Sequence, residues 1–125
     1  MLPTLFVLLV LFQIKHMFAD YFLQTPKMLS GRGQYLHLGR AQHAGVHAIG
    51  SALVLGVVGT NILTLIGLIV AEWIVHFHID FWKASHSDKK KLAPDQAAFW
   101  RAAGLDQCLH QLTYVGMAAG WAAWA

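Results

Sequence analysis

The chain has 125 residues, enough for one domain, and it is unusually apolar. Hydrophobic residues make up 57% of it and charged residues only 12%, with a mean hydropathy of +0.50. This apolar excess predicts a polytopic membrane protein and not a small soluble domain. The net charge of +3 is modest and comes from basic residues in two loops, which excludes a nucleic-acid-binding function. The single Cys108 excludes an intramolecular disulfide and a cysteine-pair metal site.

The first predicted helix covers residues 2–24. It is an apolar run of bilayer length, about 20 residues. Lys15 interrupts this run, and we expect its long side chain to reach the lipid head groups. We expect the segment to be retained and not cleaved as a signal peptide, because it lacks a basic region at its start. Pro26 and the glycines at 31 and 33 then predict a loop.

Three further helices are predicted, over residues 42–58, 62–82 and 94–124. An uncharged turn at residues 59–61 joins the second helix to the third. A polar segment with three consecutive lysines at 89–91 precedes the fourth, and Pro94 suits the first turn of that helix. The chain is therefore predicted to be all-α, a single integral membrane domain over residues 1–125. Its fold would be an up-down-up-down bundle of four transmembrane helices.

The topology follows from the distribution of positive charge. The first and third loops hold nearly all the lysine and arginine residues, whereas the second loop and both termini hold none. Cytoplasmic loops carry an excess of these residues. We therefore expect both termini outside and the two basic loops in the cytoplasm.

Every predicted helix carries polar residues at a spacing of four. These residues are His16, Asp20 and Gln24; His43 and His47; Glu72, His76 and Asp80; and Asp106 and His110. A spacing of i, i+4 places side chains on one face of a helix. The polar ends of the first and third helices are C-terminal, and those of the second and fourth are N-terminal. In an up-down bundle these four ends meet in the cytoplasmic half.

Ionisable residues inside membrane segments are costly and mark functional sites by default. The expected metal ligands are His16, Asp20, His43, His47, His76, Asp80, Asp106 and His110. Imidazole with carboxylate suits a divalent ion, with Zn, Mn or Fe favoured. Eight groups exceed one tetrahedral site, so the pattern fits two ions, or one ion whose imidazoles are oriented by carboxylates. Gln24 and Gln107 are expected to hydrogen-bond to the ligands.

The same pattern suggests catalytic roles. Asp20, Asp80 or Glu72 would take a proton from a water molecule. Lys83 and Arg40 lie at the expected mouth of the site, where they would bind a phosphate or carboxylate. The simpler alternative is an interhelical hydrogen-bond network without metal. Each such bond stabilises a membrane protein by well under ~1 kcal/mol on average. This stabilisation is small compared with the cost of placing so many ionisable groups in the membrane.

The ordered motifs also resemble a known family. They are His16-x-x-x-Asp20 with Gln24, His43-x-x-x-His47, Glu72-x-x-x-His76-x-x-x-Asp80, and Asp106-Gln107-x-x-His110. Over nearly the whole chain, this set resembles a family of small bacterial inner-membrane proteins known as a domain of unknown function. The resemblance implies a multi-pass protein of the bacterial inner membrane. The motif type is also similar to membrane-bound metal-dependent hydrolases, which implies hydrolysis of a lipid or another amphiphile.

Other functions fit the same residues, and whether the protein is an enzyme stays open. A di-iron or di-manganese redox protein would use histidines and carboxylates in a four-helix bundle. A haem-binding electron-transfer module would use facing histidines as axial ligands. A metal or proton carrier, or an accessory subunit of an oligomer or larger membrane assembly, is the remaining alternative. Membrane lipids are the expected partners in each case.

Overall fold

The computed structural model describes residues 1–23, 25, 26, 28 and 34–125. These residues form helix α1 (Leu2–Met17), the π-helical turn η1 (Phe18–Phe22) that continues it, and helices α3 (Leu38–Val58), α4 (Ile62–Lys90) and α5 (Ala97–Trp124). The described part of the chain contains no strand. The all-α prediction is therefore confirmed for these residues.

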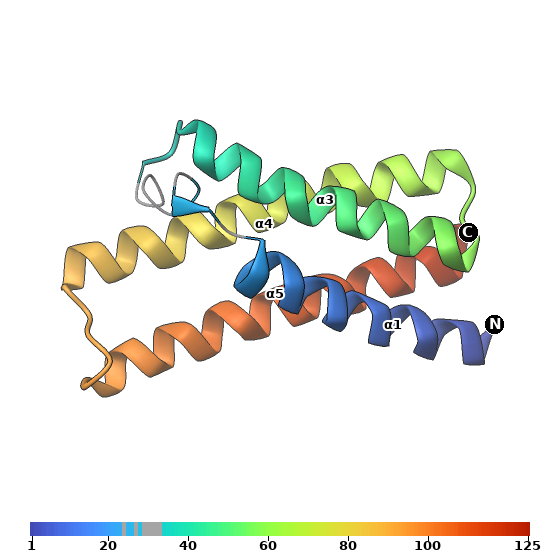
Figure 1. Ribbon diagram of the computed structural model, residues 1–125. Helices are drawn as coiled ribbons and strands as arrows, with labels where there is room; N and C mark the ends of the chain where they lie inside the picture. The colour runs from blue at the N-terminus through green and yellow to red at the C-terminus, as the bar shows by residue number, and fades with distance from the viewer. Residues whose placement is uncertain (24, 27, 29–33) are drawn as a thin grey trace.

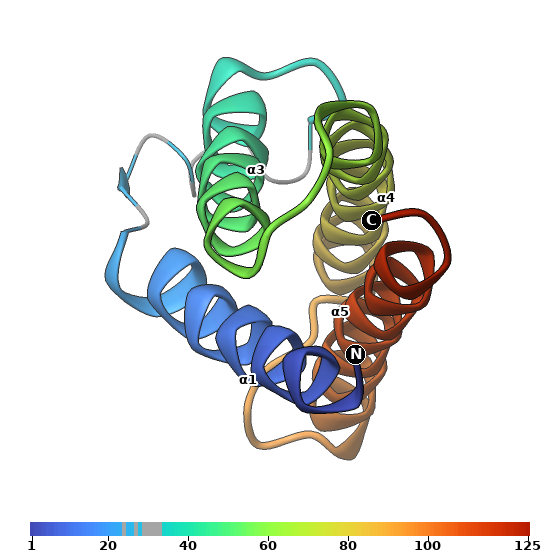
Figure 2. The same cartoon turned by 90° about the vertical axis from the view of Figure 1, so that its right-hand side faces the viewer.

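The helices form an antiparallel bundle. Viewed along its length, α1 lies between α3 and α5, and α4 lies between the same two helices on the opposite side (Figure 2). Both chain termini lie at one end of the bundle, together with the turn between α3 and α4 (Figure 1). Successive helices thus run in alternating directions, so the C-terminal ends of α1 and α4 meet the N-terminal ends of α3 and α5.

Local sequence signals set the ends of the helices. The Nδ1 atom of His37 accepts from the backbone N–H of Gly39 at 3.0 Å and caps α3. Gly59 ends this helix with φ of 83°, a conformation that glycine adopts without a steric cost. Asn61 then caps α4 by accepting from the backbone N–H of Thr64 at 3.0 Å. These caps allow the tight, uncharged turn that the sequence predicts.

Several helix ends differ from those expected. Helix α4 continues to Lys90 instead of residue 82, because residues 83–90 contain no glycine or proline to stop it. It ends only where Lys91 adopts φ of 51°. Helix α3 begins at Leu38 instead of residue 42, where His37 caps it. Helix α5 begins at Ala97, after a turn that contains Pro94.

Three helical segments of the described chain are long and apolar enough to cross a membrane. They are Leu2–Phe22, Leu38–Val58 and Ile62–Lys90. Large apolar side chains cover the outside of the bundle; Leu53 is 67% exposed and Leu63 is 80% exposed. Apolar surface of this extent marks a membrane or protein interaction surface. It agrees with the prediction of a membrane protein.

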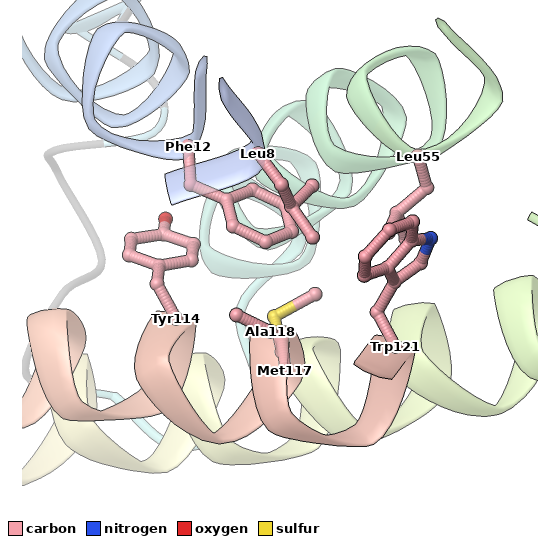
Figure 3. Packing of buried hydrophobic residues seen from close by; sticks show 7 residues of the cluster. All are labelled: Leu8, Phe12, Leu55, Tyr114, Met117, Ala118 and Trp121. Carbon is pink, nitrogen blue, oxygen red and sulfur yellow. The ribbon is translucent and has the colours of Figure 1, made fainter. Parts of the chain in front are cut away.

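The hydrophobic core fills the half of the bundle nearest the termini. It consists of Leu8, Phe12, Leu55, Tyr114, Met117, Ala118 and Trp121 (Figure 3). Phe12 and Tyr114 stack with ring centroids 5.2 Å apart. The hydroxyl of Tyr114 contacts Lys15 and His16, so this residue marks the boundary between the apolar core and a polar half. The core therefore fixes the relative positions of the helices that carry the polar side chains.

Candidate metal centre

The polar residues of all four helices meet in the half of the bundle beyond Tyr114. His47, His76 and His110 are buried there, with exposed fractions of 0%, 1% and 2%. Asp20 lies in the π-helical turn η1. At the end of this turn, the backbone N–H of Leu23 donates to the carbonyl of Phe18 at 2.9 Å. Turns of this kind often occur at functional sites.

One group of side chains surrounds the carboxylate of Asp20. The Nε2 atom of His16 lies 3.0 Å from Asp20 Oδ2. The Nε2 atoms of His47 and His43 lie 2.8 Å and 3.3 Å from Asp20 Oδ1. Three helical segments, α1, η1 and α3, thus meet at one carboxylate.

A second group surrounds Asp80, on α4. The Nε2 atom of His76 lies 3.0 Å from Asp80 Oδ2, and that of His110 lies 3.4 Å from Asp80 Oδ1. The Nε2 atom of His43 is 3.4 Å from Asp80 Oδ2, so this imidazole lies between the two carboxylates. The Nε2 atoms of His76 and His110 are buried and make no hydrogen bond of acceptable geometry with any residue that the structure describes. Short contacts without hydrogen-bond geometry are what ligands of a shared ion would show.

Two sets of donor atoms are compact enough to hold a metal ion. In each set, the donor atoms all lie within 4.8 Å of one another: Asp20, His43, His47 and His76 in one, and His76, Asp80 and His110 in the other. Two ligands bound at about 2.0–2.2 Å to one ion lie about 3 Å apart. The nitrogen-to-carboxylate distances of 2.8–3.4 Å match this spacing. Imidazole and carboxylate donors suit zinc, manganese or iron.

The remaining predicted ligands lie at the edge of these two sets. His16 contacts Asp20 but belongs to neither set. Asp106 is buried, and its Oδ1 lies 3.5 Å from the Nδ1 atom of His110, on the far side of the ring from Asp80. Gln107 bonds to His16 through its Oε1 atom at 3.1 Å. Gln24 lies outside the described residues.

Lys15 and Glu72 are ion-paired inside the bundle. Lys15 Nζ lies 2.7 Å from Glu72 Oε1, and the two side chains are 7% and 1% exposed. The expectation that Lys15 extends to the lipid head groups is therefore wrong. Lys15 follows Leu8 and Phe12 on the buried face of α1, and this periodicity was the signal for an inward position. Glu72 is thus placed beside a lysine, and it belongs to neither of the two donor sets.

Tyr114 and Ser51 are buried polar residues that sequence reasoning missed. Tyr114 follows Asp106 and His110 at a spacing of four, and Ser51 follows His43 and His47 in the same way. Extending each polar stripe by one more turn would have found both. The hydroxyl of Ser51 is buried without a hydrogen-bond partner among the described residues.

A cavity of about 310 Å³ opens beside the two carboxylates. It is lined by Asp20, Tyr21, Met28, Arg40, His43, Phe77, Asp80, Lys83, Ala84, Asp106 and Gln107. Its wall combines carboxylates, a lysine and apolar side chains. The candidate centre is therefore reachable from one side.

Arg40 lines this cavity, but its Nη1 and Nη2 atoms already donate to backbone carbonyls, and its buried Nε atom has no hydrogen-bond partner among the described residues. Its guanidinium lies 3.7 Å from the ring centroid of Phe77 and donates to the backbone carbonyls of Tyr35, at 2.5 Å, and Phe77. These contacts hold the loop before α3 against α4. Lys83 makes no hydrogen bond or ion pair with the described residues, so it is the better placed of the two predicted anion-binding groups.

Comparison with known proteins places the chain in a family. No curated protein and no solved structure matches it. One family model matches residues 7–123, which includes every described residue of the candidate centre. The chain belongs to the family described as "Protein of unknown function (DUF3307)".

Proposed function

We propose that this protein is a membrane-embedded, metal-dependent hydrolase that acts on a lipid or another amphiphile. The observation that carries the proposal is the convergence of buried imidazole Nε2 atoms on two carboxylates. Within the described part of the chain, the Nε2 atoms of His76 and His110 have no hydrogen-bond partner, although each lies close to Asp80. A buried polar atom without a partner is costly, and a bound cation would remove that cost.

The proposal includes a fourth membrane span. Helix α5 has 28 residues, which corresponds to about 42 Å at 1.5 Å per residue. It runs along α1 and α4, and it turns Leu112 and Val115 outward with exposed fractions of 59% and 53%. A helix of this length beside two membrane-spanning segments would cross the bilayer with them. The basic loops then favour termini outside the inner membrane.

The residues around the cavity suit hydrolysis. When bound, a divalent ion supplies Lewis acidity to a water or a substrate oxygen. Asp20 and Asp80 line the cavity and are the candidates to hold the proton released there. Lys83 would bind an anionic head group, while Tyr21, Met28 and Phe77 would contact an apolar portion. Glu72 is the weaker candidate for proton transfer, because it is paired with Lys15.

Two measurements test this function on the purified full-length chain. Elemental analysis should find a stoichiometric divalent metal, and His76→Ala and His110→Ala should lose it. A panel of lipids with different head groups should reveal release of a head group or acyl chain by the metal-loaded protein and not by either variant. Protein that takes up no divalent metal would contradict the proposal.

A two-metal redox centre is the second candidate, because the two donor sets overlap at His76. Optical and magnetic spectra of the iron- and manganese-loaded protein separate this function from hydrolysis. The haem alternative is less favoured. The imidazole rings of His47 and His76 have centroids only 3.9 Å apart, and those of His76 and His110 only 4.3 Å. Rings in such close contact leave no gap for a porphyrin between them.

A further inference from the structure

The amine of Lys15 determines which nitrogen of His47 carries a proton. A lysine ammonium has three N–H donors and no acceptor. Lys15 Nζ lies 2.7 Å from Glu72 Oε1, 2.7 Å from Tyr114 Oη and 3.3 Å from His47 Nδ1. All three atoms must therefore accept. A neutral His47 that accepts at Nδ1 carries its proton on Nε2.

The same hydrogen-bond direction continues through Tyr114 to His16. Because its oxygen accepts from Lys15, the Tyr114 hydroxyl can donate its hydrogen to His16 Nδ1, 3.2 Å away. His16 then carries its proton on Nε2, which lies 3.1 Å from Gln107 Oε1 and 3.0 Å from Asp20 Oδ2. Gln107 donates through Nε2 to Asp106 Oδ2 at 3.1 Å, and this fixes its oxygen toward His16.

The carboxylate of Asp20 therefore receives one N–H group, because His47 Nε2 donates to its Oδ1 atom at 2.8 Å. The Nε2–H of His16 is bonded to Gln107 Oε1, and this nitrogen also lies 3.0 Å from Asp20 Oδ2. An imidazole nitrogen that carries a proton has no lone pair for a metal ion. In this arrangement His47 donates to Asp20 and His16 donates to Gln107, so neither imidazole is a metal ligand through Nε2.

The environment of Asp80 has the opposite character. The Nδ1 atom of His110 lies 2.8 Å from the backbone carbonyl of Asp106, which can only accept, so Nδ1 carries the proton. A neutral His110 then turns the lone pair of Nε2 toward Asp80 Oδ1, 3.4 Å away. His76 Nε2 is also buried without a hydrogen-bond partner among the described residues, 3.0 Å from Asp80 Oδ2. The lone pair of His110 Nε2 repels the carboxylate of Asp80 unless a cation lies between them.

We infer that the centre holds one metal ion, bound by His76, Asp80 and His110, and that Lys15 is a positioning residue that keeps His47 as a donor to Asp20 and His16 as a donor to Gln107. This inference rests on the metal binding proposed above and decides between the two donor sets. Three protein ligands leave a coordination position open, which is typical of catalytic sites. Asp80 lines the cavity, so that position faces the side from which a substrate arrives.

Glutamine substitutions test the assignment, because the glutamine amide can replace an Nε2–H donor but is a poor metal ligand. The full-length wild type and each variant are stripped with a chelator and titrated with Zn²⁺. We expect one equivalent in the wild type and in His47→Gln, with affinities within about tenfold. We expect at least a hundredfold loss of affinity in His76→Gln and His110→Gln. His86→Gln, on α4 outside both donor sets, is the matched control.

The outcomes separate the inference from the function on which it rests. Wild-type protein that binds no Zn²⁺ would overturn both. Two equivalents in the wild type, or loss of zinc from His47→Gln, would overturn the single-ion assignment and leave metal binding intact. X-ray absorption of the zinc-loaded wild type needs no variant and should show two imidazole ligands and no second metal. A metal–metal distance in this X-ray absorption spectrum would overturn the inference, even if a variant failed to fold.

The role of Lys15 has its own readout. In ¹⁵N spectra of the zinc-loaded protein, His47 and His16 should carry hydrogen on Nε2, and His110 on Nδ1. The charge-neutral double variant Lys15→Met with Glu72→Gln should release His47 into a mixture of the two tautomers. A purely structural role for Lys15 would leave the His47 tautomer unchanged. That result, or hydrogen on Nδ1 of His47 in the wild type, would contradict the positioning role.

Discussion

Lys15 on α1 and Glu72 on α4 form an ion pair with 2.7 Å between Nζ and Oε1, although they are 57 residues apart in sequence. Both side chains are buried, so water cannot solvate either charge when its partner is removed. Removing one partner of a buried pair costs about 3–5 kcal/mol, whereas replacing both with apolar residues is often tolerated. The pair should therefore behave as a unit.

The first prediction concerns this unit. Lys15→Met alone should lower the free energy of unfolding by about 3–5 kcal/mol, because Glu72 is left charged and buried. Lys15→Met combined with Glu72→Leu should recover most of that loss. Denaturant unfolding of the protein in micelles measures both. If the effects of the two single changes simply added, the residues would not be coupled.

The second prediction concerns Gly50, on α3. A Cβ atom at this position would lie 2.6 Å from Cγ and 2.8 Å from Cδ of Lys15. The lysine cannot easily move aside, because its amine is held by three partners. Gly50→Ala should therefore destabilise the protein by about 1–3 kcal/mol.

Gly45, on the same helix, provides the control for Gly50. A Cβ atom there would meet nothing within 4 Å. Gly45→Ala should cost no stability in the same unfolding assay. An equal loss for both substitutions would mean that contact with Lys15 is not the cause.

The third prediction concerns the hydroxyl of Tyr114. Tyr114→Phe keeps the ring that stacks on Phe12 and removes the oxygen that accepts from Lys15 at 2.7 Å. Loss of a buried hydrogen bond of this kind should lower the free energy of unfolding by about 1–3 kcal/mol. Tyr35→Phe removes an exposed hydroxyl that bonds to His78 and should cost much less. Similar losses for the two variants would argue against a buried network.

The fourth prediction concerns removal of the metal. An ion that binds only the folded state stabilises it by about 2.7 kcal/mol when its free concentration is one hundred times the dissociation constant. A chelator should therefore lower the Tm of the wild type, and added Zn²⁺ should restore it. His110→Gln should show neither response. A chelator-sensitive Tm in that variant would mean that the ion binds elsewhere.

The fifth prediction concerns Lys83, which lines the cavity. If it binds an anionic head group in the ground state and transition state alike, Lys83→Gln should raise KM with little change in kcat. A loss of one charged hydrogen bond of about 1.5–3 kcal/mol corresponds to roughly a 10- to 150-fold increase. Lys89→Gln, at the exposed end of α4, is the matched control. A fall in kcat alone would place Lys83 in a different role.

The helices and the polar faces were predictable from sequence, because both depend on local spacing. His76 and Asp80 are four residues apart on one helix, and their contact at 3.0 Å follows from that spacing. The antiparallel order then brings His43 and His110 to the same depth. These features need only helix periodicity and chain direction.

The partners across the bundle were not predictable in the same way. A lone lysine in an apolar run is compatible with either snorkelling or burial, and only the arrangement of the bundle, which places α4 diagonally across from α1, provides Glu72 as its partner. Arg40 is similar, since its guanidinium donates to the carbonyl of Tyr35, in a loop whose path no periodicity predicts, and to that of Phe77 on α4. The direction of each hydrogen bond follows only from these long-range contacts. They therefore also determine whether His47 acts as a hydrogen-bond donor or as a metal ligand.

The π-helical turn at Phe18–Phe22 has a consequence for how the length of this segment can vary. One residue of an α-helix corresponds to a rotation of about 100°. Deleting a single residue between His16 and Asp20 would reduce their separation from four residues to three and turn the Asp20 carboxylate by about this angle relative to His16, which it contacts at 3.0 Å. Substitutions on the outward side of the turn leave the register intact. This stretch should therefore accept changes of side chain far more readily than changes of length.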